Sequence, residues 1–177
     1  MGLRPPLGRT VKVIVIYPSG SRAARLLGER IRDACDADLV VVRQIRRPHP
    51  GLALYLLGGI RALCSGAGLI EPGSIDVSSY HRIVICTPGR VGRPVNAMER
   101  AIGALAGCEG KGAVVCAISG SPPDRTLAAL EAALAERGVR AIGGFAFTPR
   151  DLGDPRRIDA LLSRITGRDG GEAEGAG

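Results

Sequence analysis

The chain has 177 residues, 45% of them hydrophobic, which is enough for one domain with a full-sized core. Aromatic residues make up only 3% and tryptophan is absent, so aliphatic side chains must fill that core. The net charge of +7 comes mainly from arginine, but no aromatic residues interleave with the densest cluster (Arg43, Arg46 and Arg47), so nucleic-acid binding is not expected.

The N-terminal part of the chain begins with residues 1–10, which contain two prolines and two arginines but no apolar core of a signal sequence. We expect a flexible N-terminus on a cytoplasmic protein. An apolar run at 11–17 is typical of a buried strand, and a small polar loop, 19–21, follows it. A helical pattern at about 22–36 then begins, so hydroxyl groups and free N–H groups meet at a helix N-terminus, which favours an anion such as phosphate.

Four more apolar runs follow, at 38–42, 82–87, 112–119 and 139–147. The periodicity predicts further helices at about 51–65, 94–107, 123–137 and 154–167. The apolar runs are continuous rather than alternating, as in parallel strands that are covered on both faces. The fold class is therefore α/β, a doubly wound parallel sheet with helices on both faces. Ligands of such sheets bind beyond the carboxyl ends of the strands, at loops 18–22, 87–93 and 119–124.

The segment 51–70 is rich in leucine but is interrupted by Gly58, Gly59 and Arg61. A membrane span needs about 20 apolar residues, so no span is expected here. We interpret the segment as an apolar helical insertion, buried against the sheet or a second copy, with contact to a membrane surface as the alternative. The last residues, 168–177, contain glycine, alanine and glutamate without an apolar anchor and are expected to be a disordered tail.

The five cysteines, Cys35, Cys64, Cys86, Cys108 and Cys116, show no C-x-x-C pair. Two of them, Cys86 and Cys116, lie within apolar runs. Reduced core thiols are therefore expected, with neither a disulfide framework nor a metal site. We also find no Ser-His-Asp arrangement or carboxylate pair, so no catalytic residue is predicted.

Three stretches, in matching order and spacing, resemble the flavodoxin-like family. Residues 17–24, Tyr-Pro-Ser-Gly-Ser-Arg-Ala-Ala, are similar to the family's loop Tyr-x-Ser-x-Thr-Gly-Asn-Thr, which grips the FMN phosphate. Residues 78–94 resemble the stretch that closes over the flavin ring, and 111–122 resemble the family's "G-K" strand and the glycine-rich loop after it. The resemblance covers roughly residues 11–147 and includes, at 51–70, an insertion common in one branch of the family.

The resemblance implies a flavodoxin-like domain over residues 11–167, with five parallel strands in the order 2-1-3-4-5. It also implies that three loops bind FMN. The residues it assigns to the cofactor are Ser19, Gly20, Ser21, Arg22, Ala23, Ala24, Thr87, Pro88, Gly89, Arg90, Gly92, Ser119, Gly120 and Ser121.

Four of these residues depart from the family's pattern, and one of them is Ala23, which replaces an asparagine. Ala24 replaces a threonine, and the lost hydroxyl alone would cost about 1 kcal/mol of binding free energy. Arg22 replaces a glycine and adds a charge-assisted donor that offsets this loss. Arg90 stands where many relatives have tryptophan, and its guanidinium can stack on a flat ring.

The resemblance further implies electron transfer, with NAD(P)H as the electron donor of some members. Flavodoxin carriers are usually acidic and this chain is basic, which favours a reductase of quinones or other small acceptors, or an acidic protein partner. The insertion at 51–70 is similar to that of flavodoxin-type protoporphyrinogen oxidases and also favours a reductase. The alternative is a decayed flavin site on a binding or scaffold module. A homodimer through 51–70 is a further hypothesis.

Overall fold

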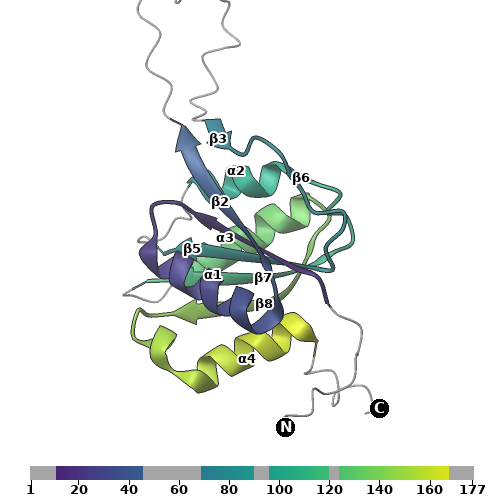
Figure 1. Ribbon diagram of the computed structural model, residues 1–177. Helices are drawn as coiled ribbons and strands as arrows, with labels where there is room; N and C mark the ends of the chain where they lie inside the picture. The colour runs from purple at the N-terminus through teal and green to yellow at the C-terminus, as the bar shows by residue number, and fades with distance from the viewer. Residues whose placement is uncertain (1–10, 46–68, 90–95, 120–123, 168–177) are drawn as a thin grey trace, which may run out of the picture.

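A six-stranded sheet forms the centre of the structure, with the strand order β3-β2-β1-β5-β7-β8 (Figure 1). The computed structural model describes residues 11–45, 69–89, 96–119 and 124–167. The strands of this sheet are β1 (Val13–Pro18), β2 (Asp38–Ile45), β3 (Leu69–Glu71), β5 (Arg82–Pro88), β7 (Gly112–Ile118) and β8 (Arg140–Phe147). Strands β2, β1, β5, β7 and β8 are parallel, which confirms the predicted order 2-1-3-4-5.

Three short strands were not predicted. Strand β3 pairs antiparallel with the end of β2, so the large sheet has six strands instead of five. Residues Leu69 and Ile70 therefore lie in a strand and not in a helical insertion, while 51–68 lie outside the described residues. Strands β4 (Ile75–Asp76) and β6 (Leu105–Ala106) form a separate two-stranded sheet. The predicted helix at 94–107 is correspondingly shorter, because the chain becomes extended after residue 104.

The helices cover both faces of the large sheet, as predicted. Their bounds are α1 (Arg22–Cys35), α2 (Asn96–Gly103), α3 (Asp124–Glu136) and α4 (Pro155–Thr166), with a short 3-10 helix, η3 (Asp151–Gly153), before α4. Figure 1 shows α1 and α4 in front of the sheet and α2 and α3 behind it. Each pair closes its own apolar core against the sheet. No helix among the described residues is long and apolar enough to cross a bilayer.

The central strands β1, β5 and β7 are buried along almost their whole length, as their continuous apolar runs predict. Cys86 and Cys116 lie opposite each other in β5 and β7, and both are buried. A hydrogen bond to Cys86 and burial raise the pKa of the Cys116 thiol well above its ordinary value. A raised pKa keeps the thiol protonated, so this pair packs as part of the core.

Candidate site at the carboxyl edge of the sheet

The predicted loops begin at the carboxyl ends of three neighbouring strands, β1, β5 and β7. The first residue after each of these strands still donates a backbone hydrogen bond to the adjacent strand. These bonds run from Ser19 N to Val42 O (2.9 Å), from Gly89 N to Ile118 O (2.7 Å) and from Ser119 N to Phe147 O (2.8 Å). The sheet ladder therefore fixes the start of all three loops along one edge of the molecule.

Ser21 defines the N-terminus of α1. Its backbone is extended, with φ −115° and ψ 105°, and its Oγ accepts a hydrogen bond from Ala24 N at 3.2 Å. Ser21 N donates to Pro18 O at 3.3 Å, which closes the turn between β1 and α1. The N–H groups of Arg22 and Ala23 lie in the first helical turn, where no earlier helical carbonyl can accept them. This end of the helix therefore offers backbone donors to an anion.

Arg22 is exposed at the first position of α1 and has no ion-pair partner within the described ranges. Helix α1 has no acidic residue in its first turn. Arg25 is paired with Glu29 at 2.8 Å, and this contact raises the pKa of Arg25. A cation at a helix N-terminus is unfavourable by itself, because the helix dipole is positive there. A bound anion would turn the same arrangement into a favourable one.

The other small residues of the first loop differ in their exposure. Gly20 is exposed, and an added Cβ there would meet nothing within 4 Å. Ala23 is half-buried, whereas Ala24 is fully buried in the core under α1, and its N–H is already bound by Ser21. The structure therefore places Ala24 in the core, apart from the other predicted contact residues of this loop.

The second and third loops touch each other. A Cβ on Gly89 would lie 2.6 Å from the Ser119 Cβ, so the loops approach as closely as they do only because residue 89 is glycine. Pro88, Gly89 and Ser119 are partly exposed at this edge. Thr87 is fully buried, and its Oγ1 donates to Pro88 O at 3.4 Å, so its side chain belongs to the core beneath the loop.

Four of the predicted contact residues, Arg90, Gly92, Gly120 and Ser121, lie outside the described residues. The described part of the site therefore consists of the end of α1 and of the contact between residues 89 and 119. A separate cavity of about 480 Å³ lies at the opposite, amino-terminal edge of the sheet. Its lining residues carry no motif from which the cavity could be predicted.

Comparisons with known proteins match this architecture at low sequence identity. No family model and no curated protein matches the sequence. Among solved structures, a flavoprotein from Lactobacillus acidophilus in complex with FMN is 14% identical, with a TM-score of 0.56 over 88% of this chain and 98% of that one. An NADH:FMN oxidoreductase (EMOB) in its apo form is 18% identical, with a TM-score of 0.55 over 93% of this chain and 92% of the other.

A third similar structure is the Megasphaera elsdenii flavodoxin, which is 15% identical with a TM-score of 0.54 over 88% of this chain and 98% of the flavodoxin. The parallel strand order and the two helical layers agree with these similarities. The chain therefore has the flavodoxin-like fold.

Proposed function

We propose that this protein binds FMN at the carboxyl edge of the sheet and acts in electron transfer. The observation that carries the proposal is the N-terminus of α1. The N–H groups of Arg22 and Ala23 meet there with the Arg22 side chain, which has no ion-pair partner among the described residues, in a helical turn that contains no acidic residue. The FMN phosphate has close to two negative charges, and backbone donors at a helix N-terminus together with a guanidinium suit such a group.

The chain and the cofactor would have separate tasks. FMN, when bound, supplies the redox chemistry. Arg22, Ala23 and the Ser21 hydroxyl would hold the phosphate, and residues 88–89 and 119 would line the flavin side of the same edge. Two of the structures with this fold support the choice of cofactor, since one is a complex with FMN and another is an NADH:FMN oxidoreductase.

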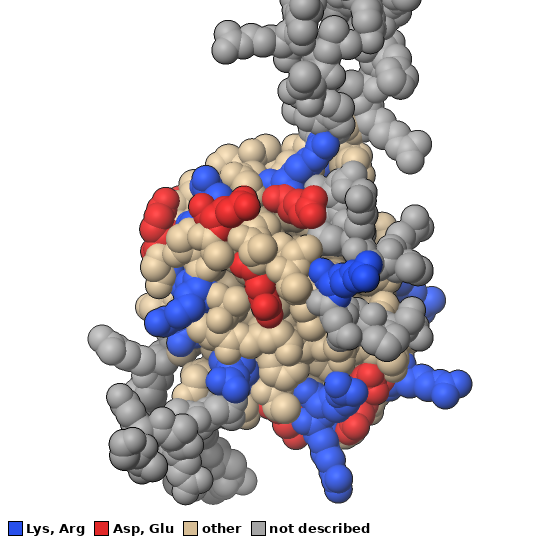
Figure 2. Space-filling model, turned by 180° about the vertical axis from the view of Figure 1, so that it is seen from behind, with Lys and Arg blue, Asp and Glu red and all other residues tan. Residues whose placement is uncertain are grey.

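The net charge of +7 favours a reductase over an electron carrier. Figure 2 shows basic and acidic side chains interspersed on the face opposite to that of Figure 1. Because flavodoxin carriers are usually acidic and this chain is basic, we infer that the protein takes electrons from NAD(P)H and passes them to quinone-like or other small acceptors. An acidic protein partner is the second choice. The homodimer through 51–70 and the cytoplasmic location remain predictions from the sequence.

The visible spectrum of the purified protein tests the proposal directly. We expect a yellow protein, or a colourless one that becomes yellow and stays so after incubation with FMN and removal of the excess. A protein that holds no flavin after this treatment would contradict FMN binding and would support the alternative, a binding or scaffold module with a decayed site.

Turnover then separates a reductase from a carrier. The FMN-loaded protein should oxidise NADH or NADPH when a soluble benzoquinone is present, and a flavin-free sample provides the control. Bound flavin that can be reduced chemically but not by either nucleotide would support FMN binding and contradict the reductase activity.

A further inference from the structure

The amino-terminal edge of the sheet carries a row of basic side chains. Lys12 precedes β1, Arg82 begins β5, Lys111 precedes β7 and Arg140 begins β8. These four strands are neighbours, and their register aligns the start of each with the start of the next. Adjacent strands lie about 4.8 Å apart, so the topology brings the four residues to one edge of the sheet. Arg82 and Arg140 share one register level, whereas Lys12 and Lys111 lie one residue earlier and so belong to the opposite face of the pleat.

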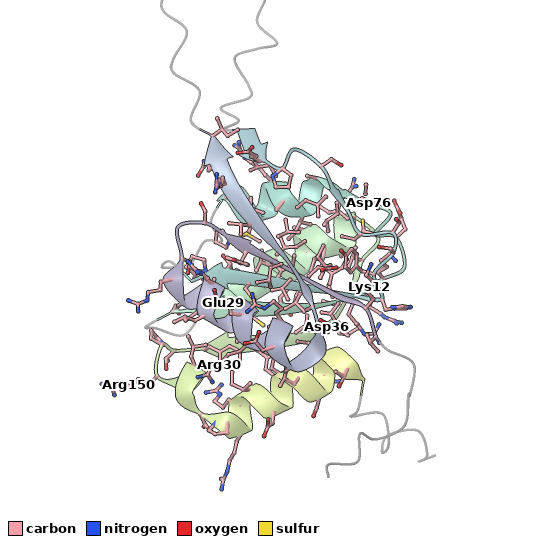
Figure 3. All side chains as sticks on the ribbon, in the orientation of Figure 1. Lys12, Glu29, Arg30, Asp36, Asp76 and Arg150 are labelled. Carbon is pink, nitrogen blue, oxygen red and sulfur yellow. The ribbon has the colours of Figure 1, made fainter. Side chains whose placement is uncertain are left out.

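Two carboxylates at this edge are already hydrogen-bonded to the chain. Asp38 accepts a bond from the Tyr80 hydroxyl at 2.7 Å. Asp76 accepts one from Ser78 N at 2.9 Å, and this bond lowers the pKa of Asp76. Figure 3 shows Asp76 and Lys12 toward the same end of the sheet, with Arg150 at the other end. Neither carboxylate forms an ion pair with Arg82.

A cavity of about 480 Å³ opens beside this row. Its volume lies within the range of small-molecule sites. The walls combine apolar and polar groups: a valine and a tyrosine ring, a histidine, an arginine, and a lysine with a glycine on either side of it in sequence. The lining residues are Val11, Tyr80, His81, Arg82, Gly110, Lys111 and Gly112.

The two cations in the cavity wall differ in how their donors are used. Lys111 Nζ donates to Ser78 O at 2.9 Å and to Tyr80 O at 2.7 Å, so this lysine holds the loop before β5 in place. Arg82 makes one long hydrogen bond, from Nη1 to His81 O at 3.4 Å. Its Nε is buried and has no partner among the described residues. The Arg82 guanidinium therefore has donors that the described part of the chain does not satisfy.

His81 adds a further donor. Its Nδ1 accepts a hydrogen bond from Lys12 N at 3.0 Å. In the neutral ring the proton must then be on Nε2, which leaves that nitrogen as a donor. Lys12 itself lies over the Tyr80 ring, with Nζ 4.6 Å from the ring centroid. The cavity thus offers positive charge and N–H donors beside an aromatic surface.

We propose that this cavity binds a small organic anion with a carboxylate or phosphate group. Arg82 would bind the anionic group with help from His81 and the neighbouring cations, and the rest of the molecule would lie against Tyr80 and Val11. This site is at the opposite edge of the sheet from the proposed FMN site and does not depend on it.

Amide chemical shifts in a ¹H–¹⁵N NMR spectrum of the full chain test this proposal. Inorganic phosphate and citrate are titrated separately at constant ionic strength, which distinguishes the two anionic groups. We expect saturable shifts at Arg82, Gly110 and Gly112 with at least one of the two anions. Shifts at Arg22 and Ala23 would report phosphate at the other edge and are assessed separately.

The variant Arg82→Gln should raise the apparent Kd at the amino edge about tenfold or more, since it removes a charge-assisted hydrogen bond. It should leave any shifts at Arg22 unchanged. The matched control Arg150→Gln, at the other end of the sheet, should have no effect. If Arg82→Gln does not give a folded spectrum, Lys12→Gln should still weaken binding about threefold. The absence of saturable shifts at the amino edge with both anions, or binding unaffected by the Arg82 and Lys12 variants, would overturn the proposal.

Discussion

Arg22 lies where a helix dipole already concentrates positive charge, and no acidic residue in the first turn of α1 compensates it. If it contacts the FMN phosphate, Arg22→Ala should weaken FMN binding by about 1.5–3 kcal/mol. Binding of riboflavin, which lacks the phosphate, should be nearly unchanged. Flavin fluorescence titrations of both ligands measure the difference, with Arg30→Ala, an exposed arginine on the same helix, as the control.

The same variant has a second measurable consequence. Removing a cation from the helix N-terminus should leave the free energy of unfolding of the flavin-free protein unchanged or raise it by about 0.3–1 kcal/mol. Equal losses of affinity for FMN and riboflavin, or a clear loss of stability, would mean that Arg22 has a structural role instead.

Gly89 keeps the second and third loops in contact. In Gly89→Ala the new methyl group would lie 2.6 Å from the Ser119 Cβ, so one loop must move. We expect a loss of about 1–3 kcal/mol of stability, together with weaker FMN binding. Urea unfolding measures the first effect, and Gly20→Ala is the control because its added Cβ meets nothing within 4 Å. An unfolding midpoint equal to that of the wild type would show that the loops separate without cost.

Residue-level predictions from a motif assign positions but not the direction of side chains. The resemblance assigns Ala24 and Thr87 to the cofactor site, and the structure shows that both side chains are fully buried in the core. Burial depends on which side of α1 packs against the sheet and on how the helices cover the two faces of β5. Both are set by packing between the sheet and its two helical layers. Ser21 and Arg22, by contrast, follow from sequence, because a serine before a helical pattern is a strong N-cap signal.

At the level of elements, the N-cap of α1 can be separated from its proposed role in binding. Aspartate caps helices as well as serine does, so Ser21→Asp should keep the stability of the flavin-free protein. It should weaken FMN binding strongly, because a carboxylate would then face the phosphate. Ser21→Ala, which removes the cap, should lower the free energy of unfolding by about 1 kcal/mol.

Thermal unfolding of the flavin-free variants and FMN titration give the two readouts. If Ser21→Asp binds FMN as tightly as the wild type, the phosphate does not lie at this end of α1. Even in that case, the free energies of unfolding of the wild type, Ser21→Asp and Ser21→Ala test whether Ser21 stabilises α1 as its N-cap.

The predicted elements that agree with the structure have local signals. Helix α4 is capped by Gly167, which has φ 72°, and α3 is followed by Gly138, which has φ 68°. Such glycines stop helices and can be recognised in a sequence. Strand β3 has only three residues and β6 only two, so no periodicity distinguishes them. They exist because neighbouring strands offer backbone partners, which no local pattern reveals.

For the molecule as a whole, the strand order could be predicted from the resemblance to the flavodoxin-like family, and the ligand-binding edge because ligands of doubly wound sheets bind beyond the strand ends. The basic row at the other edge could not. Its members, Lys12, Arg82, Lys111 and Arg140, are isolated in the sequence and come together only through the register of four strands. The signal, a basic residue at or just before four strand starts, becomes visible once the strands are known.

The hydrogen bond between Tyr80 and Asp38 joins the loop before β5 to the start of β2, 42 residues apart in sequence. This bond and the nearby carboxylate raise the pKa of Tyr80. A raised pKa in the folded state means that the stabilisation is complete below the ordinary tyrosine pKa of about 10 and is lost as the pH rises through the folded value.

Tyr80→Phe should therefore be less stable than the wild type by about 1 kcal/mol near neutral pH, through loss of the hydrogen bond. The difference in free energy of unfolding should stay constant up to about pH 9.5 and shrink above about pH 10, where Tyr80 begins to ionise in the unfolded wild type. Guanidinium unfolding of both proteins across this range measures it, and Tyr17→Phe provides the comparison at a tyrosine buried under α1. A difference that stays the same into strongly alkaline solution would show that the contact with Asp38 does not contribute to the stability of the whole molecule.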